Sequence, residues 1–476
     1  MTFSRHRLRW LAAIAISGAI QSQSSCAEVS MPKATRAAET QITHRPVGHI
    51  LTNINVWSPD GKWIVYDTRS DPAGEIFDGS TIEIVNVESG QVREIYRSHN
   101  GAHCGVATFS PRENRVVFIL GPENPTSDWP YGPCHRQGVM VDIDRPQVAE
   151  LLDARNINPP FTPGALRGGT HVHVFDQAGA WVSSTYEDHV LAELDASSTG
   201  GAHDANQRNV AVSVLHHSVR VPQGHHNHDG SSFSVLATQT TNNPRPGSDD
   251  ISRACEEAWI GTNGYIRADG SRQQHAIAFQ GKVTILNGEQ ISEVFVVDLP
   301  DDLTHAGDHP LEGAATTRPF PPRGTQQRRL THTANRKYPG LQGPRHWLRS
   351  SPDGSSIAFL MRDDDGVIQI WTVASNGGSP SQLTHNSFGV ASTFSWSPTG
   401  ESIAYIAGNS VFVSDFHSGT ATRLTPRADD ASAPRPEACV FSPTGDRIAY
   451  VRCMPSGGET FNQVFVVSAV QPDSKP

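Results

Sequence analysis

A repeated turn constrains the fold more than any other feature of this 476-residue sequence. The pair Ser-Pro, usually followed by Asp-Gly or Thr-Gly, separates two short apolar runs, and such turns join antiparallel strands. The first two turn serines lie 52 residues apart, and the last three are spaced by 46 and 45 residues. This period is typical of folds in which each repeat is one small sheet. The turn serines are Ser58, Ser110, Ser351, Ser397 and Ser442.

The clearest repeat spans residues 344–385 and predicts four antiparallel strands. The first strand ends at the turn serine, and the second and third cover 357–360 and 367–373. The fourth covers 381–384 and follows an Asn-Gly-Gly turn. Four strands in about 40 residues are one blade of a β-propeller, and one such sheet cannot bury its apolar faces alone. We therefore predict an all-β single propeller of seven blades, with eight as the alternative. A β-sandwich is disfavoured because sandwiches do not repeat a four-strand unit at constant period.

The two ends of the chain predict how the ring closes. Residues 39–48 resemble a lone fourth strand, and its three missing partners fit 439–441, 448–451 and 463–467. We expect the N- and C-terminal strands to share one blade, because this removes the free edge of an open ring. Between 215 and 328 the period loosens, and residues 248–258 have the pattern of a capped helix.

The N-terminus predicts export. Basic residues at 5–9, an apolar run at 10–20 and small residues up to Ala27 are typical of a secretory signal peptide. We expect residues 1–27 to be the signal peptide, 28–38 a disordered linker, 39–470 the propeller and 471–476 a disordered tail. The protein would be periplasmic or secreted, with a lipid anchor at Cys26 less favoured. No other apolar run is long enough to span a membrane.

Composition limits the partners. A net charge of −10 argues against a nucleic-acid backbone, which requires a concentrated basic surface. Five cysteines follow residue 27, an odd number, so at least one thiol stays free or pairs elsewhere. Cys439 and Cys453 flank one predicted hairpin and could face each other. We expect a monomer; an oligosaccharide ligand, or an envelope protein as a further candidate partner, is expected only from family resemblance.

The predicted fold also predicts where a site would lie. The first strand of each blade lines the central channel, so residues just before each turn serine should converge near the axis. His171 and His173 alternate along one strand and would share a face, which fits either a metal site or a polar channel wall. The run 225–229 is more typical of an exposed loop. The converging residues are Asn53, His103, Arg167, His171, His173, Arg345, His346 and Glu437.

Two segments carry a family resemblance. Residues 162–173, which contain Arg167-Gly168-Gly169-Thr170-His171, and the run Pro344-Arg345-His346-Trp347 resemble segments of the YidR-like periplasmic propeller family. More distantly, the chain is similar to oligogalacturonate lyases and rhamnosyl-glucuronate lyases. Its second half also resembles TolB-type propellers, a likeness that implies fold only. The lyase resemblance implies a channel-face site of histidine and arginine, sometimes with a divalent metal.

The implied reaction is β-elimination on a uronate-containing oligosaccharide. It requires a cation on the carboxylate, a base for the C5 proton and an acid for the leaving oxygen. We expect Arg167 and Arg345 to hold the carboxylate, His103 to be the base, and Tyr131 or His171 the acid. The alternative is a non-catalytic TolB-like binding or scaffold propeller. Further expected substrate contacts are His346, Trp129 and Arg136, and candidate ligands for Mn²⁺ or Ca²⁺ are His171, His173 and His346.

Overall fold

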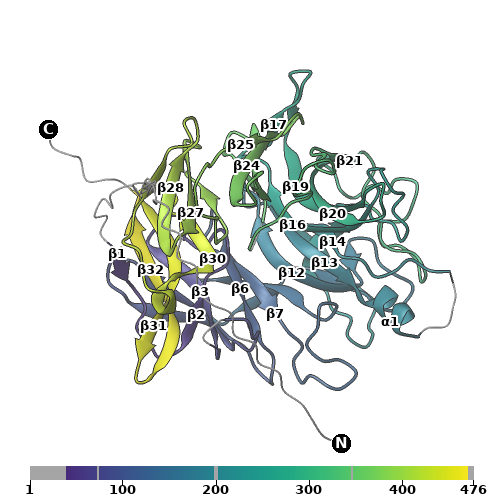
Figure 1. Cartoon of the computed structure of the whole chain (residues 1–476). Helices are drawn as coiled ribbons and strands as arrows, with labels where there is room; N and C mark the ends of the chain where they lie inside the picture. The colour runs from purple at the N-terminus through teal and green to yellow at the C-terminus, as the bar shows by residue number, and fades with distance from the viewer. Residues whose placement is uncertain (1–38, 72–73, 198–201, 345–346, 470–476) are drawn as a thin grey trace, which may run out of the picture. The chain divides into compact units, whose positions relative to one another are not determined.

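Seven four-stranded antiparallel sheets follow one another along the described residues and lie as blades around a central axis (Figure 1). The computed structural model describes residues 39–71, 74–197, 202–344 and 347–469. The predicted signal peptide, linker and tail lie outside these residues, as do Arg345 and His346. Within the described chain, the predicted all-β propeller with seven blades is confirmed, and the alternative of eight is wrong.

The first four blades are formed by consecutive segments of the chain. Blade 1 contains β2 (Gly48–Ile50), β3 (Trp63–Arg69), β4 (Thr81–Asn86) and β5 (Val92–Arg97). Blade 2 contains β6 (Cys104–Phe109), β7 (Arg115–Leu120), β8 (Gln137–Asp142) and β9 (Ala149–Leu151). Blade 3 contains β12 (Gly168–Phe175), β13 (Trp181–Asp188), β14 (Asn209–Val219) and β15 (Gly230–Leu236). Blade 4 contains β16 (Ile251–Trp259), β19 (His275–Thr284), β20 (Gln290–Leu299) and β21 (Gln326–Arg329).

The last three blades complete the ring. Blade 5 contains β22 (Arg349–Ser350), β23 (Ser356–Arg362), β24 (Ile368–Ala374) and β25 (Ser381–Gln382). Blade 6 contains β26 (Ser395–Trp396), β27 (Ser402–Ala407), β28 (Ser410–Asp415) and β29 (Ala421–Arg423). Blade 7 contains β30 (Pro434–Phe441), β31 (Arg447–Ser456), β32 (Glu459–Ser468) and β1 (Glu39–Gln41).

The ring closes through the chain termini, as predicted. β1 pairs with β32 in antiparallel register, with Glu39 opposite Val467 and Gln41 opposite Phe465. The Tyr450 hydroxyl donates a hydrogen bond to the Glu39 carboxylate across the same blade. This closure covers the edge of β32 that would be unpaired if the two ends of the chain did not meet.

A few short elements lie outside the blades. They are the helix α1 (His189–Ser197), the parallel pair β10 (Ala154–Arg155) and β11 (Ala165–Leu166), the hairpin β17 (Tyr265–Ile266) and β18 (Arg272–Gln273), and a 3-10 turn at Asp430–Ser432. A search of the described residues finds no helix with the length and apolar character needed to span a bilayer.

Each pair of neighbouring blades shares a buried apolar cluster, which explains why one blade cannot stand alone. Between blades 7 and 1, for example, Val466 and Val440 pack with Tyr66. Between blades 2 and 3, Val117 and Met140 pack with Phe175. Apolar burial therefore stabilises the ring mainly through contacts between repeats.

The predicted helix at 248–258 is wrong, because residues 251–258 belong to β16, the first strand of blade 4. Its pairing with β19 shifts register between Ile251 and Ala254 and again between Cys255 and Ala258. Each bulge inserts extra residues between inward-facing positions, so the apolar residues are spaced by three and four instead of two. That spacing imitates one face of a helix.

The cysteines remain unpaired. Cys439 lies opposite Tyr450 and Cys453 lies opposite Asn462, so the two thiols considered as partners do not face each other. All five cysteines of the described chain are free: Cys104, Cys134, Cys255, Cys439 and Cys453.

Candidate functional site

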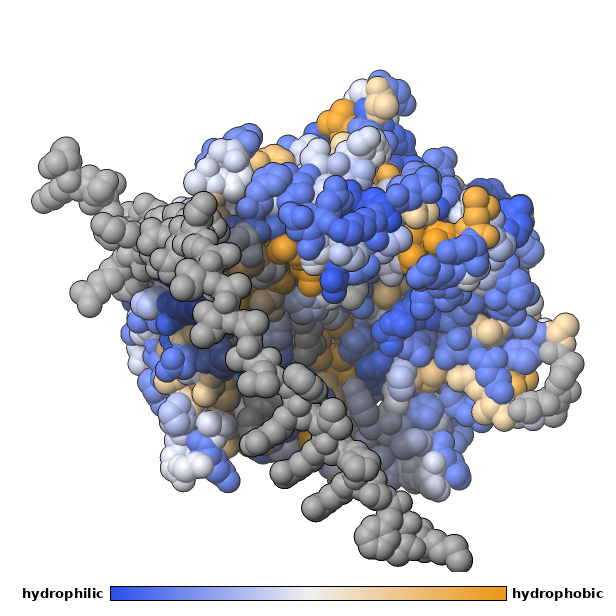
Figure 2. Space-filling model, in the orientation of Figure 1, coloured by the Kyte–Doolittle hydropathy of each residue, from blue (hydrophilic) through white to orange (hydrophobic). Residues whose placement is uncertain are grey.

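Two cavities lie at the centre of the ring. We call the first the loop-side cavity, because it opens where loops enter the inner strands, and the second the turn-side cavity, because the Ser-Pro turns surround it. Figure 2 shows a hollow near the middle of one face, with hydrophobic residues in its wall. The loop-side cavity has a volume of about 410 Å³ and is lined by residues 50–53, Arg69, Gly74, Glu75, Phe77, Val106, Tyr131, Arg136, His171, Val172, Trp347 and Glu437.

Arg136 is the residue that most sharply defines the chemistry of the loop-side cavity. It ends the insertion between β7 and β8 and is 9% exposed. Its Nε is buried without a hydrogen-bond partner in the part of the chain that the structure describes. A buried guanidinium without a matching anion is costly, so this position favours a ligand that carries a carboxylate or phosphate.

Arg69 provides a second cation, held in a fixed orientation. Its Nε donates to Asp67 Oδ2 at 2.6 Å, and its guanidinium lies 4.7 Å from the centre of the Phe77 ring. The other Asp67 oxygen accepts the Val106 backbone N–H at 2.9 Å. Asp67 compensates the charge of Arg69, whereas Arg136 forms no ion pair with a described carboxylate, although Glu75 and Glu437 line the same cavity.

His171 faces the cavity as a neutral imidazole. Burial and the positive charges of Arg136 and Arg208 hold the pKa of His171 well below its usual range. Its Nδ1 is buried and makes no hydrogen bond to any described residue. A neutral ring with an available nitrogen can accept a proton, and its pKa would rise once an anion neutralised Arg136.

Tyr131 lies beside Arg136 and is positioned by aromatic packing. Its ring stacks on Phe77 at 4.8 Å with an interplanar angle of 15°. Burial raises the pKa of Tyr131, although the nearby Arg136 opposes this effect. The phenol therefore keeps its proton at neutral pH and can donate it.

The insertion reaches the cavity because it packs closely on β12. A side chain at Gly169 would place its Cβ 2.1 Å from the Pro133 carbonyl oxygen, so only glycine allows this approach. Trp129 fixes the same insertion from its other side. Its ring is stacked between His135 at 3.8 Å and His226 at 3.7 Å. The expected substrate contact Trp129 is therefore a packing residue in the structure, outside the cavity wall.

His171 and His173 do not share a face, contrary to expectation. The pairing of β12 with β13 shifts register between His171 and Val174, and Val172 at the bulge has φ 55°. His171 therefore lines the cavity, whereas His173 is fully buried toward Gly138 of blade 2. Burial, together with the charge of Arg136, lowers the pKa of His173 to about 3.

Two valines of the cavity wall are strained. Val106 and Val172 have φ values of 59° and 55°, a region that β-branched residues rarely adopt. Such backbone conformations persist where the surrounding structure imposes them, and they concentrate at functional sites. Both lie in inner strands beside Arg69 and His171, so the strain coincides with the candidate site.

Arg167 is already satisfied by the protein. Its Nε and Nη2 donate to Asp188 Oδ2 at 3.0 and 2.6 Å, and its Nη1 donates to the Ala314 carbonyl at 2.5 Å. The residue is fully buried and does not line either cavity. His103 precedes β6 but is also absent from the cavity wall. Of the expected channel residues, the structure brings together Asn53, His171 and Glu437 with Tyr131 and Arg136 of the insertion.

Arg69 and Trp347 line the cavity but were not predicted. Arg69 ends the second strand of blade 1, a position that the rule for inner strands does not reach. Trp347 follows the predicted Arg345-His346 pair, and its Nε1 is buried without a partner among residues the structure describes. Its neighbours in sequence were the only signal that could have indicated it.

The described donors do not fit a Mn²⁺ or Ca²⁺ site. They contain no cluster of three or more His, Cys, Asp or Glu side chains arranged to hold a metal ion. His171 and His173 point to different sides of β12, and His346 lies outside the described residues. The guanidinium groups of Arg69 and Arg136 also make this part of the cavity unfavourable for a second cation.

Together, fold and site define a seven-bladed β-propeller with an axial cavity whose wall contains two arginines and two glutamates. Residues 103–229 match the family described as "Protein of unknown function (DUF3748)". Residues 368–474 match the "Dipeptidyl peptidase IV (DPP IV) N-terminal region". Protein YidR of Escherichia coli (strain K12) is 45% identical over 419 residues, which cover 87% of this chain and 95% of YidR. The chain belongs to the YidR family.

The solved structure of an oligogalacturonate lyase supports the propeller fold. An oligogalacturonate lyase in complex with manganese aligns with a TM-score of 0.54 at 11% identity, covering 93% of this chain and 97% of the lyase. A putative TolB from Agrobacterium tumefaciens aligns with a TM-score of 0.38 at 14% identity, covering 82% and 98%. At 11% identity the likeness to the lyase shows the fold alone, and nothing is inferred from the TolB alignment.

Proposed function

We propose that the protein binds a uronate-containing oligosaccharide in the loop-side cavity and cleaves it by β-elimination. One observation carries the proposal: Arg136, whose Nε has no hydrogen-bond partner among the described residues, shares a cavity of about 410 Å³ with neutral His171 and the protonated phenol of Tyr131. Cation, base and acid are the three groups that this reaction requires.

Arg136, His171 and Tyr131 each have one role in the proposed reaction. Arg136 binds the carboxylate on C5 and stabilises the charge that develops when the C5 proton leaves. The His171 imidazole accepts this proton, and Tyr131 donates its proton to the glycosidic oxygen as the C4–O bond breaks. A C4–C5 double bond forms, so the atoms and electrons balance. Arg136 takes the role expected for Arg167, whose guanidinium is paired with Asp188.

The low pKa of His171 is consistent with this role only if substrate changes it. The pKa is held down by burial and by Arg136, and a bound carboxylate would neutralise Arg136. Substrate binding would therefore raise the basicity of His171 at the moment when a base is needed. No step of this proposal passes through a metal ion.

Residues 1–27 support a proposal about where the protein acts. Their basic, apolar and small-residue segments favour export to the periplasm or the medium. A monomeric protein in that compartment could meet oligosaccharides released from cell-wall polymers, and it could also meet an envelope protein. Fractionation of cells that express the full chain tests this proposal, and retention with the cytoplasm would contradict it.

A panel of uronate oligosaccharides tests the reaction. Purified protein is incubated with galacturonate- and glucuronate-containing oligosaccharides, and ultraviolet absorbance of the unsaturated product is followed. Each reaction is run with Mn²⁺, with Ca²⁺ and with a chelator. We expect at least one substrate to give product, and Arg136→Gln to remove it. Absence of product from every substrate under all three conditions would contradict catalysis.

Binding without cleavage is the second candidate function. The observation that favours it is the low pKa of His171, because a weakly basic imidazole makes proton abstraction slow. In this case uronates would bind with an affinity that depends on Arg136, but no unsaturated product would form. Calorimetric titration in parallel with the absorbance assay separates the two functions.

A further inference from the structure

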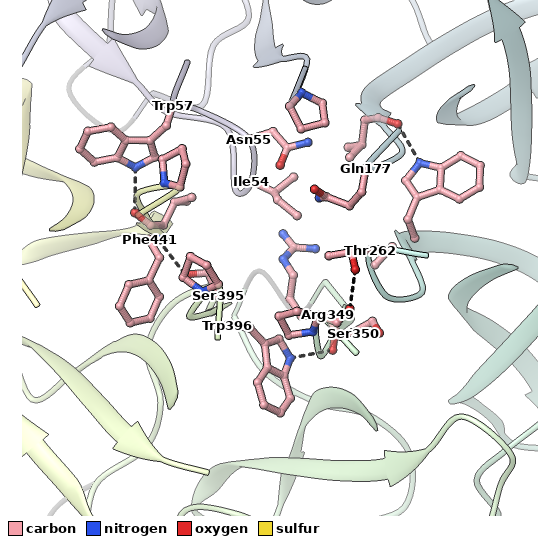
Figure 3. Close-up of a pocket in the computed structure, with 18 of the residues that line it drawn as sticks. Ile54, Asn55, Trp57, Gln177, Thr262, Arg349, Ser350, Ser395, Trp396 and Phe441 are labelled. Carbon is pink, nitrogen blue, oxygen red and sulfur yellow. Dashed lines mark hydrogen bonds between the residues drawn. The ribbon is translucent and has the colours of Figure 1, made fainter. Parts of the chain in front are cut away.

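The turn-side cavity is a second, separate concave site. It has a volume of about 320 Å³, within the size range of small-molecule pockets. The Ser-Pro turns that reveal the repeat in the sequence surround it, and one proline comes from each of five blades (Figure 3). These prolines are Pro59, Pro111, Pro352, Pro398 and Pro443. The proposed lyase reaction uses none of these residues.

The wall of the turn-side cavity is mainly apolar, with serine and threonine residues between the proline and tryptophan rings, and it is fixed in place. The indole N–H of Trp57 donates to the Val440 carbonyl at 3.1 Å, and that of Trp396 donates to the Arg349 carbonyl at 3.1 Å (Figure 3). Each bond joins a blade to the blade that precedes it in the ring. Because proline rings and bonded indoles have little freedom, a ligand would find this site largely preformed.

The base of the turn-side cavity is polar and incompletely satisfied. Arg349 reaches into it and is 4% exposed, and Gln177 points toward the same space (Figure 3). Buried atoms without a hydrogen-bond partner in the described chain are Arg349 Nε, Asn55 Nδ2 and Glu257 Oε1. Neighbouring Arg349 nitrogens do bond, to Leu348 O at 2.7 Å and to Asn53 Oδ1 at 2.5 Å. No carboxylate forms an ion pair with Arg349 among the ion pairs of the described residues, in contrast to Arg69 and Arg167.

We propose that the turn-side cavity binds a small organic carboxylate with an apolar body. The carboxylate would approach Arg349 and the amides of Asn55 and Gln177, and the apolar body would pack against the ring of proline and tryptophan side chains. The geometry supports this orientation, because the donors lie at the base and the apolar residues form the wall.

Charge and shape together select this class of ligand. A cationic ligand would meet the Arg349 guanidinium, and a polar sugar would leave its hydroxyls unpaired against proline and indole rings. Glu257 also lines the cavity, and in its charged form it attracts Arg349. Burial raises the pKa of Glu257 to about 7, so a large fraction is neutral near neutral pH and can donate a hydrogen bond. An anionic head on an apolar body leaves the fewest groups unsatisfied.

Titration with a matched pair of probes tests the proposal. The probes are 3-phenylpropionate and its neutral counterpart 3-phenylpropanol, followed by tryptophan fluorescence and calorimetry on the full chain. We expect the acid to bind about tenfold more tightly than the alcohol, which is the effect of one charge-assisted hydrogen bond. Equal affinity of the two probes, or binding of neither, would overturn the proposal.

Two substitutions at Gln177 locate the binding site without disturbing the core. Gln177→Trp should fill the cavity and abolish binding, and Gln177→Glu should remove the preference for the acid by placing a second anion there. Gln290→Trp, on an exposed position of β20, is the matched control and should bind like the unmodified protein. Undiminished binding to Gln177→Trp would place the ligand elsewhere. A saturating uronate should not displace the probe, which distinguishes this site from the loop-side cavity.

Discussion

Arg349 donates hydrogen bonds from Nη2 to both oxygens of Asn53, at 2.5 Å to Oδ1 and 3.0 Å to the backbone carbonyl. Asn53 lines the loop-side cavity and Arg349 lines the turn-side cavity, and the two cavities share no lining residue. This contact between blades 1 and 5 therefore spans the axis and separates the two sites. We therefore expect ligands of different chemistry to occupy the two cavities independently.

The Asn53 contact should contribute measurably to stability. Asn53→Ala removes one hydrogen bond to a buried cation and should lower the free energy of unfolding by about 2 kcal/mol. Urea unfolding followed by circular dichroism measures this change. Asn243→Ala, at an exposed position, is the control and should leave stability unchanged. If Asn53→Ala were as stable as the unmodified protein, water would have replaced the lost hydrogen bond.

Arg136 should determine the affinity for uronates. Arg136→Gln keeps hydrogen-bonding groups but removes the charge, and it should weaken binding of a uronate disaccharide by about 10- to 100-fold. Calorimetric titration measures the dissociation constant. Arg220→Gln removes an exposed arginine as the matched control. If both variants bind equally well, the cavity does not recognise the carboxylate through Arg136.

His171 and Tyr131 should affect turnover more than binding. His171→Asn and Tyr131→Phe should each reduce kcat by about 10²- to 10⁴-fold, the usual effect of losing a general base or acid. KM should change little, because Arg136 remains to hold the substrate. Steady-state kinetics across pH provide the measurement, and the wild-type limb caused by His171 should be absent in His171→Asn. A change in KM alone would assign both residues to binding.

Trp129 lies outside the cavity wall, but its stacking should affect both stability and uronate affinity. Trp129→Ala removes a large buried ring between His135 and His226, and it should lower stability by about 3 to 5 kcal/mol. Uronate affinity should also fall, because Tyr131 and Arg136 lie on the same insertion. Trp129→Phe, which preserves part of the stack, should restore most of both properties. Unchanged affinity in a folded Trp129→Ala protein would show that the insertion holds its shape without the stack.

Buried histidines predict loss of stability in acid. Burial lowers the pKa of His49 to about 4 and that of His173 to about 3. An unfolded imidazole binds a proton below about pH 6.5, and the folded one only near pH 4, so protonation favours the unfolded chain. At pH 4, the lowered pKa of His49 alone should reduce the free energy of unfolding by about 3 kcal/mol. Thermal unfolding from pH 7.5 down to 4 should show a falling Tm, and His49→Asn should flatten the curve.

Most of the fold could be predicted from the sequence because each repeat carries its own signals. The turn at Ser442-Pro443 and its relatives mark the inner hairpins, and the apolar runs beside them mark the strands that pack between blades. The ends of the chain revealed the shared blade because each lacked its partners. The exception was β16, where two bulges replaced the alternation of a strand by the spacing of a helix.

The candidate site was harder to predict, because the distance of a residue from the turn serine does not determine where its side chain points. The bulge at Val172 separates His171 from His173, and no residue of the sequence indicates it in advance. Arg167 occupies an expected position, but its partner Asp188 lies at the end of the next strand. Arg69 comes from a second strand, so it could be found only from the assembled ring.

A crystal structure of the protein with a bound uronate disaccharide is the most direct test of the central claim. Our account predicts density for the sugar in the loop-side cavity, with its carboxylate within about 3 Å of the Arg136 guanidinium and its C5 facing His171. A disaccharide bound elsewhere, or a carboxylate turned away from Arg136, would contradict it.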